Sequence, residues 1–207
     1  MAVLADLPGI ATLPALASER LLPVTPPLEE VLPQRGVQRG SSVLVTGRSP
    51  GVTALALELL VGVSTSGSWC AVAGFPDLGL VSASERGLDL SRLLLVPFPG
   101  TRERWPQVVA ALFDAVDAVL VVPPASLRPA DARKLAARAR DRRSVLFLLD
   151  KQASWPGPVD LRCTVASSKW NGLGSGHGLL RQCSLELEVS GRGAAARPRQ
   201  VPVLLSA

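Results

Sequence analysis

The chain has 207 residues, of which 47% are hydrophobic and 19% charged, which suits one folded domain with short extensions. A net charge of +5 permits contact with nucleic acid or an acidic partner. The three cysteines are odd in number and far apart, which argues against a disulfide framework or a zinc site. No apolar run approaches the roughly 18–20 residues of a membrane span, and Asp6 and Pro8 do not fit a signal peptide. We therefore expect a cytoplasmic protein without cofactor or metal.

Residues 1–34 contain six prolines, and proline forbids long helices. This stretch is predicted to be a Pro-rich, partly ordered N-terminal arm. Gly36 and Gly40 then mark a turn before the first strong strand.

Apolar patterning from there to residue 150 alternates between strands and helices. Strands are predicted at 42–46, 68–75, 93–97, 118–122 and 144–149, and helices at 53–63, 78–86, 102–116 and 129–141. Because the strands are apolar on both sides, we predict an α/β fold with a mostly parallel sheet flanked by helices.

The character of the sequence changes after residue 150, where a β-rich C-terminal extension is predicted. A strand at 161–166 is followed by a flexible Gly-rich loop at 170–178. The next strand, 183–189, alternates strictly, with Cys183, Leu185, Leu187 and Val189 on one side and Glu186 and Glu188 on the other. A basic linker with Arg192, Arg197 and Arg199 leads to a last apolar piece at 201–205. We expect the strand at 183–189 to be an edge to which a partner can add a strand.

The stretch "VLVTGRSPGVTALALELL" (43–60) has the strand, Gly-rich turn and helix of a phosphate-binding loop. Gly47, Gly51 and Thr53 remain, but the glycines are one residue too close, and Val52 stands where the pattern has lysine. Losing that charge weakens nucleotide binding by roughly 10- to 100-fold. The loop is therefore predicted to be degenerate and to hold no cofactor.

The carboxylates that phosphoryl transfer needs are also missing. The strand at 118–122 ends in Pro123 where a metal-binding acid belongs, and Asp117 lies at its other end. Phe75 stands where an acid would orient the attacking water. We expect no ATPase activity.

Three stretches together resemble the RecA core: "LPQRGVQRGSSVLVTGRSPGVTALALELL", "WCAVAGFPDLGLVSASERGLDLSRLLLVP" and "AVDAVLVVPPASL". The resemblance covers about residues 28–165 and implies a RecA-like fold. It fails at Val52, Phe75 and Pro123, which stand where the family carries its ATP chemistry. The predicted organisation is an arm (1–34), a RecA-like core with a degenerate phosphate loop (35–166) and a partner-binding extension (167–207).

The tail "KWNGLGSGHGLLRQCSLELEVSGRGAAARPR" makes the chain similar to the short actinobacterial ImuA-type mutagenesis accessory proteins. The resemblance implies a non-catalytic adaptor in damage-induced translesion synthesis, a part of the SOS response. Its partners would be an inactive Y-family polymerase homologue (ImuB) and an error-prone replicative-type polymerase, with association with the nucleoid after DNA damage. The partner-binding candidates are Trp170, Leu185, Leu187, Val189, Arg192, Arg197 and Arg199.

Two other functions remain open. A SulA-type cell-division inhibitor has a degenerate RecA-like fold and would bind the tubulin-like division protein. A nucleotide-binding enzyme or recombinase modulator would show measurable affinity for Mg-ATP.

Several further residues allow a functional and a structural interpretation. The basic stretch 128–143 could make weak contact with DNA phosphates or be a solvated helix face. Trp155 and Trp170 flank loops and are either partner contacts or core residues. His177 has no ligand-type neighbours in the sequence, and no serine or cysteine nucleophile has a base placed beside it.

Overall fold

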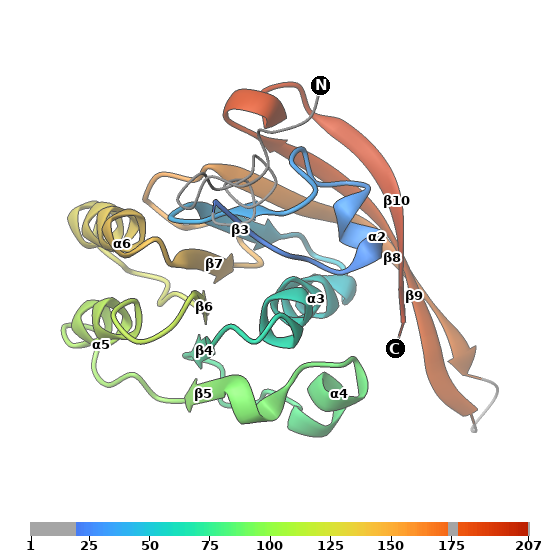
Figure 1. Cartoon of the computed structure of the whole chain (residues 1–207), viewed down its shortest axis with the longest axis horizontal. Coiled ribbons are helices and arrows are strands. Elements are labelled where there is room, and N and C mark those ends of the chain that lie inside the picture. The colour runs from blue at the N-terminus through green and yellow to red at the C-terminus, as the bar shows by residue number, and fades with distance from the viewer. Residues whose placement is uncertain (1–19, 174–177, 207) are drawn as a thin grey trace, which may run out of the picture.

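The computed structural model describes residues 20–173 and 178–206 (Figure 1). Its helices are α2 (Pro26–Glu29), α3 (Gly51–Thr65), α4 (Leu80–Glu85), α5 (Trp105–Leu112) and α6 (Pro129–Arg142). Its strands are β1 (Leu21–Leu22), β2 (Val37–Gln38), β3 (Ser42–Thr46), β4 (Cys70–Ala73), β5 (Leu93–Val96), β6 (Ala118–Val121), β7 (Val145–Leu149), β8 (Leu161–Leu173), β9 (Gly178–Gly191) and β10 (Arg199–Ser206). Two short 3₁₀ turns, Leu90–Arg92 and Gly193–Ala195, precede β5 and β10.

One eight-stranded sheet organises the molecule, with the strand order β10-β9-β8-β3-β7-β6-β4-β5. The six strands from β8 to β5 pair in parallel, whereas β9 and β10 are antiparallel to their neighbours. The predicted α/β class with a mostly parallel sheet is confirmed. The strand β3 lies in the interior of the sheet, between β7 and β8.

Strand residues alternate between two apolar layers, one on each face of the sheet. In β3, Val43 and Val45 face the layer that contains α2, α3 and α4, while Leu44 faces α5 and α6. Both faces are covered, so the strands need apolar residues at every position. The two-sided apolar runs in the sequence are explained by this arrangement.

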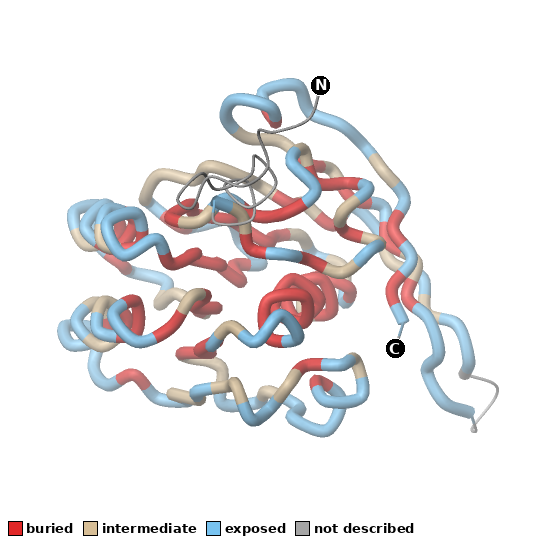
Figure 2. The backbone as a smooth tube through the Cα atoms, viewed as in Figure 1, coloured by how far each residue is buried: buried red, intermediate tan, exposed pale blue. Residues whose placement is uncertain are grey.

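The helix α3 is buried almost all round, beyond the single apolar face predicted for it (Figure 2). Strands of the sheet from β4 to β10 cover part of the helix surface, and the segment before α2 covers another part. A helix enclosed in this way needs apolar residues on every face, which "ALALELLVGV" (54–63) supplies.

The described part of the N-terminal stretch packs into the core and does not stand apart as an arm. Leu22, Val24 and Leu28 are buried in the layer that contains α3. Strand β1 also pairs with β2, which anchors this segment just before β3. Residues 1–19 of the predicted arm lie outside the described residues.

The largest difference from the predicted elements is in the C-terminal part. At the two ends of the loop predicted at 170–178 the chain is instead in strands, because β8 continues to Leu173 and β9 begins at Gly178, while residues 174–177 lie outside the described residues. The predicted boundary at residue 166 falls inside β8, so the core and the extension share one sheet. Of the helices in the described part of the chain, none is long and apolar enough to cross a membrane.

Substitution of Gly62 by alanine is predicted to destabilise the fold. A methyl group there would lie 2.4 Å from Val24 Cα and 2.9 Å from the Pro23 carbonyl oxygen, both backbone atoms. The clash outweighs the gain in helix propensity of about 1 kcal/mol, and we expect a net loss of about 1–3 kcal/mol. Urea denaturation measures this change in the free energy of unfolding.

The matched control is Gly79→Ala, because the nearest atom to its added methyl is Ser82 Cβ at 3.8 Å. That variant should stay within about 0.5 kcal/mol of the parent. Equal stability of the two variants would contradict the close packing of α3 on residues 23–24.

Candidate functional site

The loop between β3 and α3 packs directly against the C-terminal hairpin. A methyl group added to Gly47, whose φ is +131°, would lie 2.4 Å from the carbonyl oxygen of Val165. One added to Gly51 would lie 2.3 Å from Leu185 Cδ2. The Ser49 hydroxyl also donates a hydrogen bond to the Ser168 hydroxyl. Strand β8 and the side chain of Leu185 from β9 therefore occupy the space next to the glycines of the loop.

Two backbone positions of this loop cannot donate a hydrogen bond to a phosphate group. Pro50 has no N–H, and the N–H of Val52 donates to the carbonyl oxygen of Ser49 at 3.2 Å. The Val52 side chain is fully buried, so the position of the missing lysine points into the core. Thr53 is half-buried, and Arg48 is exposed on the solvent side of the loop.

At the carboxyl ends of β4 and β6, the two positions singled out in the sequence carry no carboxylate. Phe75 packs against the core layer of α3, and Pro123 follows β6. Asp117 lies at the other end of β6, where its carboxylate pairs with Arg39 at 2.6 Å. None of these residues places a carboxylate beside the loop.

Asp150 is an acidic residue at the carboxyl end of a strand next to β3, and the sequence did not single it out. It follows β7, the strand next to β3, and its backbone N–H donates to the Val45 carbonyl oxygen. Its buried carboxylate accepts hydrogen bonds from the backbone N–H groups of Gln152 and Trp155 and from the Ser154 hydroxyl. Asp150 therefore closes the turn after β7, and its oxygens are already engaged.

Three partner-binding candidates lie in the core. Leu185, Leu187 and Val189 are each 1% exposed and pack in the layer that contains α3. The predicted alternation of β9 is correct, but its apolar side faces this chain's own helices. A partner could reach these residues only by displacing the layer that covers this face of the sheet, so they are corrected from contact residues to core residues.

Trp170 is half-buried and engaged within the chain. Its ring packs against the core, and the Arg86 guanidinium lies 5.5 Å from the ring centre. Arg86 also donates a hydrogen bond to the Ser206 carbonyl oxygen at 2.8 Å, which joins α4 to the hairpin and to β10. Trp155, the other tryptophan considered above, is buried in the layer of α5 and α6.

The basic candidates lie at the opposite end of the hairpin from Trp170. Arg192 follows β9 and approaches Asp160 to 3.7 Å, and Arg199 donates to the Val31 carbonyl oxygen. Arg197 is exposed between them. The nine-residue offset between Leu161 and Trp170 corresponds to about 30 Å along β8. The predicted contact residues therefore do not form one surface.

The expected edge strand is also wrong, because β9 lies between β8 and β10. The edge strand on this side of the sheet is β10, which carries Pro202 within its paired stretch. Proline occurs in edge strands where its missing N–H faces solvent, and there it blocks the addition of a further strand.

The outer end of the hairpin exposes apolar side chains that the sequence analysis did not single out. Leu179 is 79% exposed and Leu180 is 42% exposed. β10 pairs with β9 only as far as Gln182, so this end is held by β8 alone (Figure 1). The signal in the sequence was "GLLRQ" (178–182), which interrupts the alternation that begins at Cys183.

The three thiols are free and buried. Burial raises the pKa of Cys163 to about 12. Burial, reinforced by the Asp117 charge, raises the pKa of Cys70 to about 12. A protonated thiol is a poor nucleophile and metal ligand. Among residues 20–173 and 178–206 no group of His, Cys, Asp and Glu could hold a metal ion, and His177 lies outside these ranges.

The chain belongs to the family described as the MT3502 N-terminal domain, whose family model matches residues 30–157. That span includes the loop after β3 and stops before β8. The chain is also similar to a protein of Mycobacterium tuberculosis (strain ATCC 25618 / H37Rv) named "Uncharacterized protein Rv3395c", with 37% identity over 108 residues. The match covers 52% of this chain and 51% of that protein, so the chain spans about half the length of the relative.

Restoring the lysine of the phosphate-loop pattern is predicted to damage the protein without creating a nucleotide site. Val52→Lys places an ammonium group at a fully buried position, which costs several kcal/mol of folding stability. Val52→Ile, the control, should cost less than about 1.5 kcal/mol. Thermal unfolding and Mg-ATP titration check both variants. A stable V52K protein that binds Mg-ATP would contradict a closed loop.

The buried thiols predict a loss of stability in alkaline solution. Thiols of the unfolded chain ionise near pH 9.0, whereas Cys70 and Cys163 of the folded chain ionise near pH 12. Between these values the unfolded state has lost protons that the folded state keeps, so the free energy of unfolding falls as pH rises. The expected slope is about 1 kcal/mol per pH unit for each thiol.

Urea denaturation at several pH values measures this slope, with Cys70→Ala/Cys163→Ala as the comparison. The double variant should be less stable at neutral pH and should show a flatter pH dependence. The same slope in both proteins would show that other groups cause it.

Proposed function

We propose that this protein is a non-catalytic RecA-like adaptor in damage-induced mutagenic translesion DNA synthesis. The fold part of the proposal is supported by the position of β3, an interior strand of a mostly parallel sheet that leads through a Gly-rich turn into α3. That strand, turn and helix are the parts of a phosphate-binding loop. The resemblance to the RecA core across residues 28–165 extends over the same strands.

The observation that carries the adaptor role is the closed loop after β3. Val165, Ser168 and Leu185 of the hairpin occupy the space beside Gly47 and Gly51. A nucleotide phosphate in this position would have to displace parts of the core. The loop instead supports the base of the hairpin, so a catalytic element of the ancestral fold serves here to present a binding element.

The contact surface that we propose is the outer end of the hairpin, residues 169–173 and 178–182. Leu179 and Leu180 are its exposed apolar side chains, and Lys169 and Arg181 add positive charge. Figure 2 colours most of this end as exposed, in contrast to the base of the hairpin. An exposed apolar surface with a basic rim fits a protein partner whose matching surface is apolar and acidic.

The partner classes come from the resemblance to ImuA-type proteins. They are an inactive Y-family polymerase homologue and an error-prone replicative-type polymerase. The adaptor acts in the cytoplasm, at the nucleoid after DNA damage, and needs neither a nucleotide nor a metal for this role.

The test is affinity purification of the full chain from DNA-damaged host cells, comparing the parent protein with Leu179→Glu. The added carboxylate lies on an exposed side chain, so folding should be unaffected. It removes an apolar anchor, and loss of an interface hot spot of about 2 kcal/mol lowers recovery of the polymerase homologue by about tenfold or more. Damage-induced mutation frequency should fall in parallel.

The matched control is Val81→Glu, which makes a similar change of charge at a side chain that is 74% exposed on α4. It should recover the polymerase homologue like the parent protein. Equal recovery with Leu179→Glu would remove the hairpin from the interface. Recovery of the tubulin-like division protein in place of polymerases would favour the cell-division inhibitor.

A further inference from the structure

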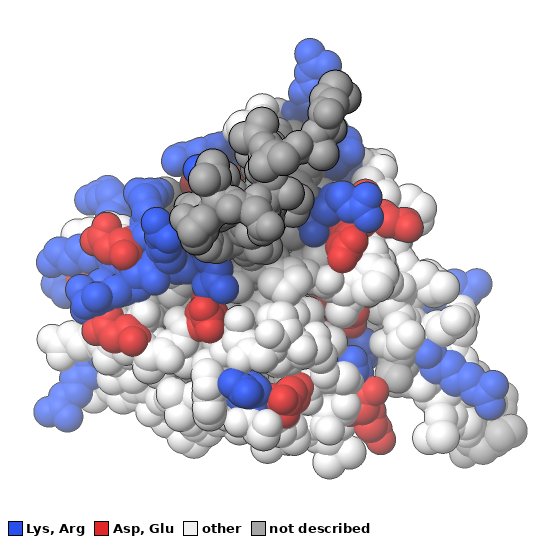
Figure 3. Space-filling view, viewed as in Figure 1, with Lys and Arg blue, Asp and Glu red and all other residues white. Residues whose placement is uncertain are grey.

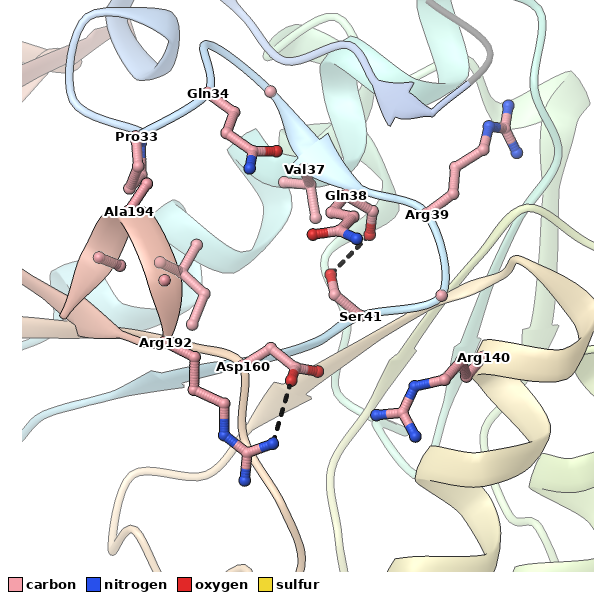
Figure 4. A pocket seen from close by; sticks show the side chains of 15 residues that line it. Pro33, Gln34, Val37, Gln38, Arg39, Ser41, Arg140, Asp160, Arg192 and Ala194 are labelled. Atoms are coloured by element: carbon pink, nitrogen blue, oxygen red, sulfur yellow. Dashed lines mark hydrogen bonds and ion pairs between the residues drawn. The ribbon is translucent and has the colours of Figure 1, made fainter. Parts of the chain in front are cut away.

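A pocket of about 300 Å³ lies where β3 and β8 begin, at the opposite end of these strands from the closed loop (Figure 4). The turn between β2 and β3, the C-terminal part of α6, and the 3₁₀ turn after β9 form its walls. Its polar residues are Gln34, Gln38, Arg39, Ser41, Arg140, Asp160 and Arg192.

Close backbone packing fixes two of these walls against each other. Gly40 has a φ of +79°, and a methyl group there would lie 3.0 Å from Arg140 Cα. Only glycine lets the β2–β3 turn approach α6 so closely. The Ser41 hydroxyl donates to the Gln38 carbonyl oxygen at 2.6 Å and holds the turn. The position from which Arg140 extends is therefore fixed relative to the turn.

The charges in the pocket do not balance. Among the described residues no carboxylate lies within 4.0 Å of the Arg140 guanidinium, and Arg192 reaches Asp160 only at 3.7 Å. Asp160 also accepts a hydrogen bond from the Ser42 N–H at 2.9 Å. Arg39 points away from Arg140 and pairs with Asp117. Two guanidinium groups thus face one carboxylate, beside the amide groups of Gln34 and Gln38.

Positive charge continues from the pocket along α6. Arg133 lies seven residues before Arg140, about two turns and 10 Å along the helix axis on nearly the same side. Arg138 and Arg142 are different, since both pair with Asp114. Figure 3 shows Lys and Arg side chains gathered over α6. A single small anion would use only the pocket, whereas a strip of free arginines fits a chain of negative charges.

We propose that this pocket and the Arg133–Arg140 side of α6 bind the backbone phosphates of duplex nucleic acid without reading its sequence. Arg140 and Arg192 hold one phosphate at the pocket, and Arg133 contacts another farther along the strand. None of the residues that line the pocket is aromatic, so it has no platform on which unpaired bases could stack. The inference rests on the pocket and not on the hairpin contact proposed above.

The test is fluorescence anisotropy of a short labelled DNA duplex with the full chain, between about 50 and 200 mM salt. Arg140→Gln should bind several-fold more weakly and lower the slope of log K against log salt by about 1, the change expected for one lost phosphate contact. The control, Arg138→Gln, removes the same charge from the same helix, and Arg142 still pairs with Asp114. The Arg138→Gln variant should show the same slope of log K against log salt as the parent protein.

Three outcomes would overturn the proposal. An equal loss of duplex affinity in Arg140→Gln and Arg138→Gln would mean that only the net charge of the protein determines binding. Stronger binding of a polyglutamate peptide than of the duplex, lost in Arg140→Gln, would assign the pocket to an acidic protein. Binding of inorganic phosphate without duplex binding would leave a small-anion site. Leu179→Glu should bind DNA like the parent, so failure here and failure of the hairpin contact are distinguishable.

Discussion

The packing of the C-terminal hairpin on the loop after β3 is the contact on which the rest of the structure depends. Gly47 and Gly51 let the loop lie against Val165 and Leu185 with no room for a side chain. This contact joins the end of β3 to β8 and β9 and covers the first turn of α3. It also fills the place where a phosphate group would bind. In the adaptor that we propose, one contact thus both closes the structure and excludes a phosphate group from the loop.

The two surfaces that we propose lie at the two ends of β8, away from the closed loop. At the outer end the hairpin exposes Leu179 and Leu180, which are apolar. At the beginning of β8, about 35–40 Å away along the strand, Arg140 and Arg192 line a basic pocket. A protein partner at one end and nucleic acid at the other would suit an adaptor that holds polymerases near DNA. Each contact is proposed on its own residues and can fail without the other.

Much of the fold could be predicted from the sequence because local pattern and tertiary role agree there. The two-sided apolar strands predicted a covered parallel sheet, and the missing lysine at Val52 predicted a loop without its usual charge. The errors came from long-range contacts. Nothing local reveals that β10 pairs outside β9 or that helices cover its apolar side, so Leu185, Leu187 and Val189 were assigned to a surface although they are core residues. The glycines at 172 and 178 suggested a loop, yet cross-strand pairing makes them part of a hairpin. The pocket was missed because its arginines come from distant segments.

A disulfide between Ser49→Cys and Ser168→Cys tests the closed loop most directly. The two serine hydroxyls are hydrogen-bonded, which brings their side chains within the range of a disulfide. The three native thiols are buried and do not compete. The account predicts rapid cross-linking under mild oxidation, with the fold retained. A double-cysteine protein that stays reduced, while the parent chain binds Mg-ATP, would show that the loop is open and would contradict the account.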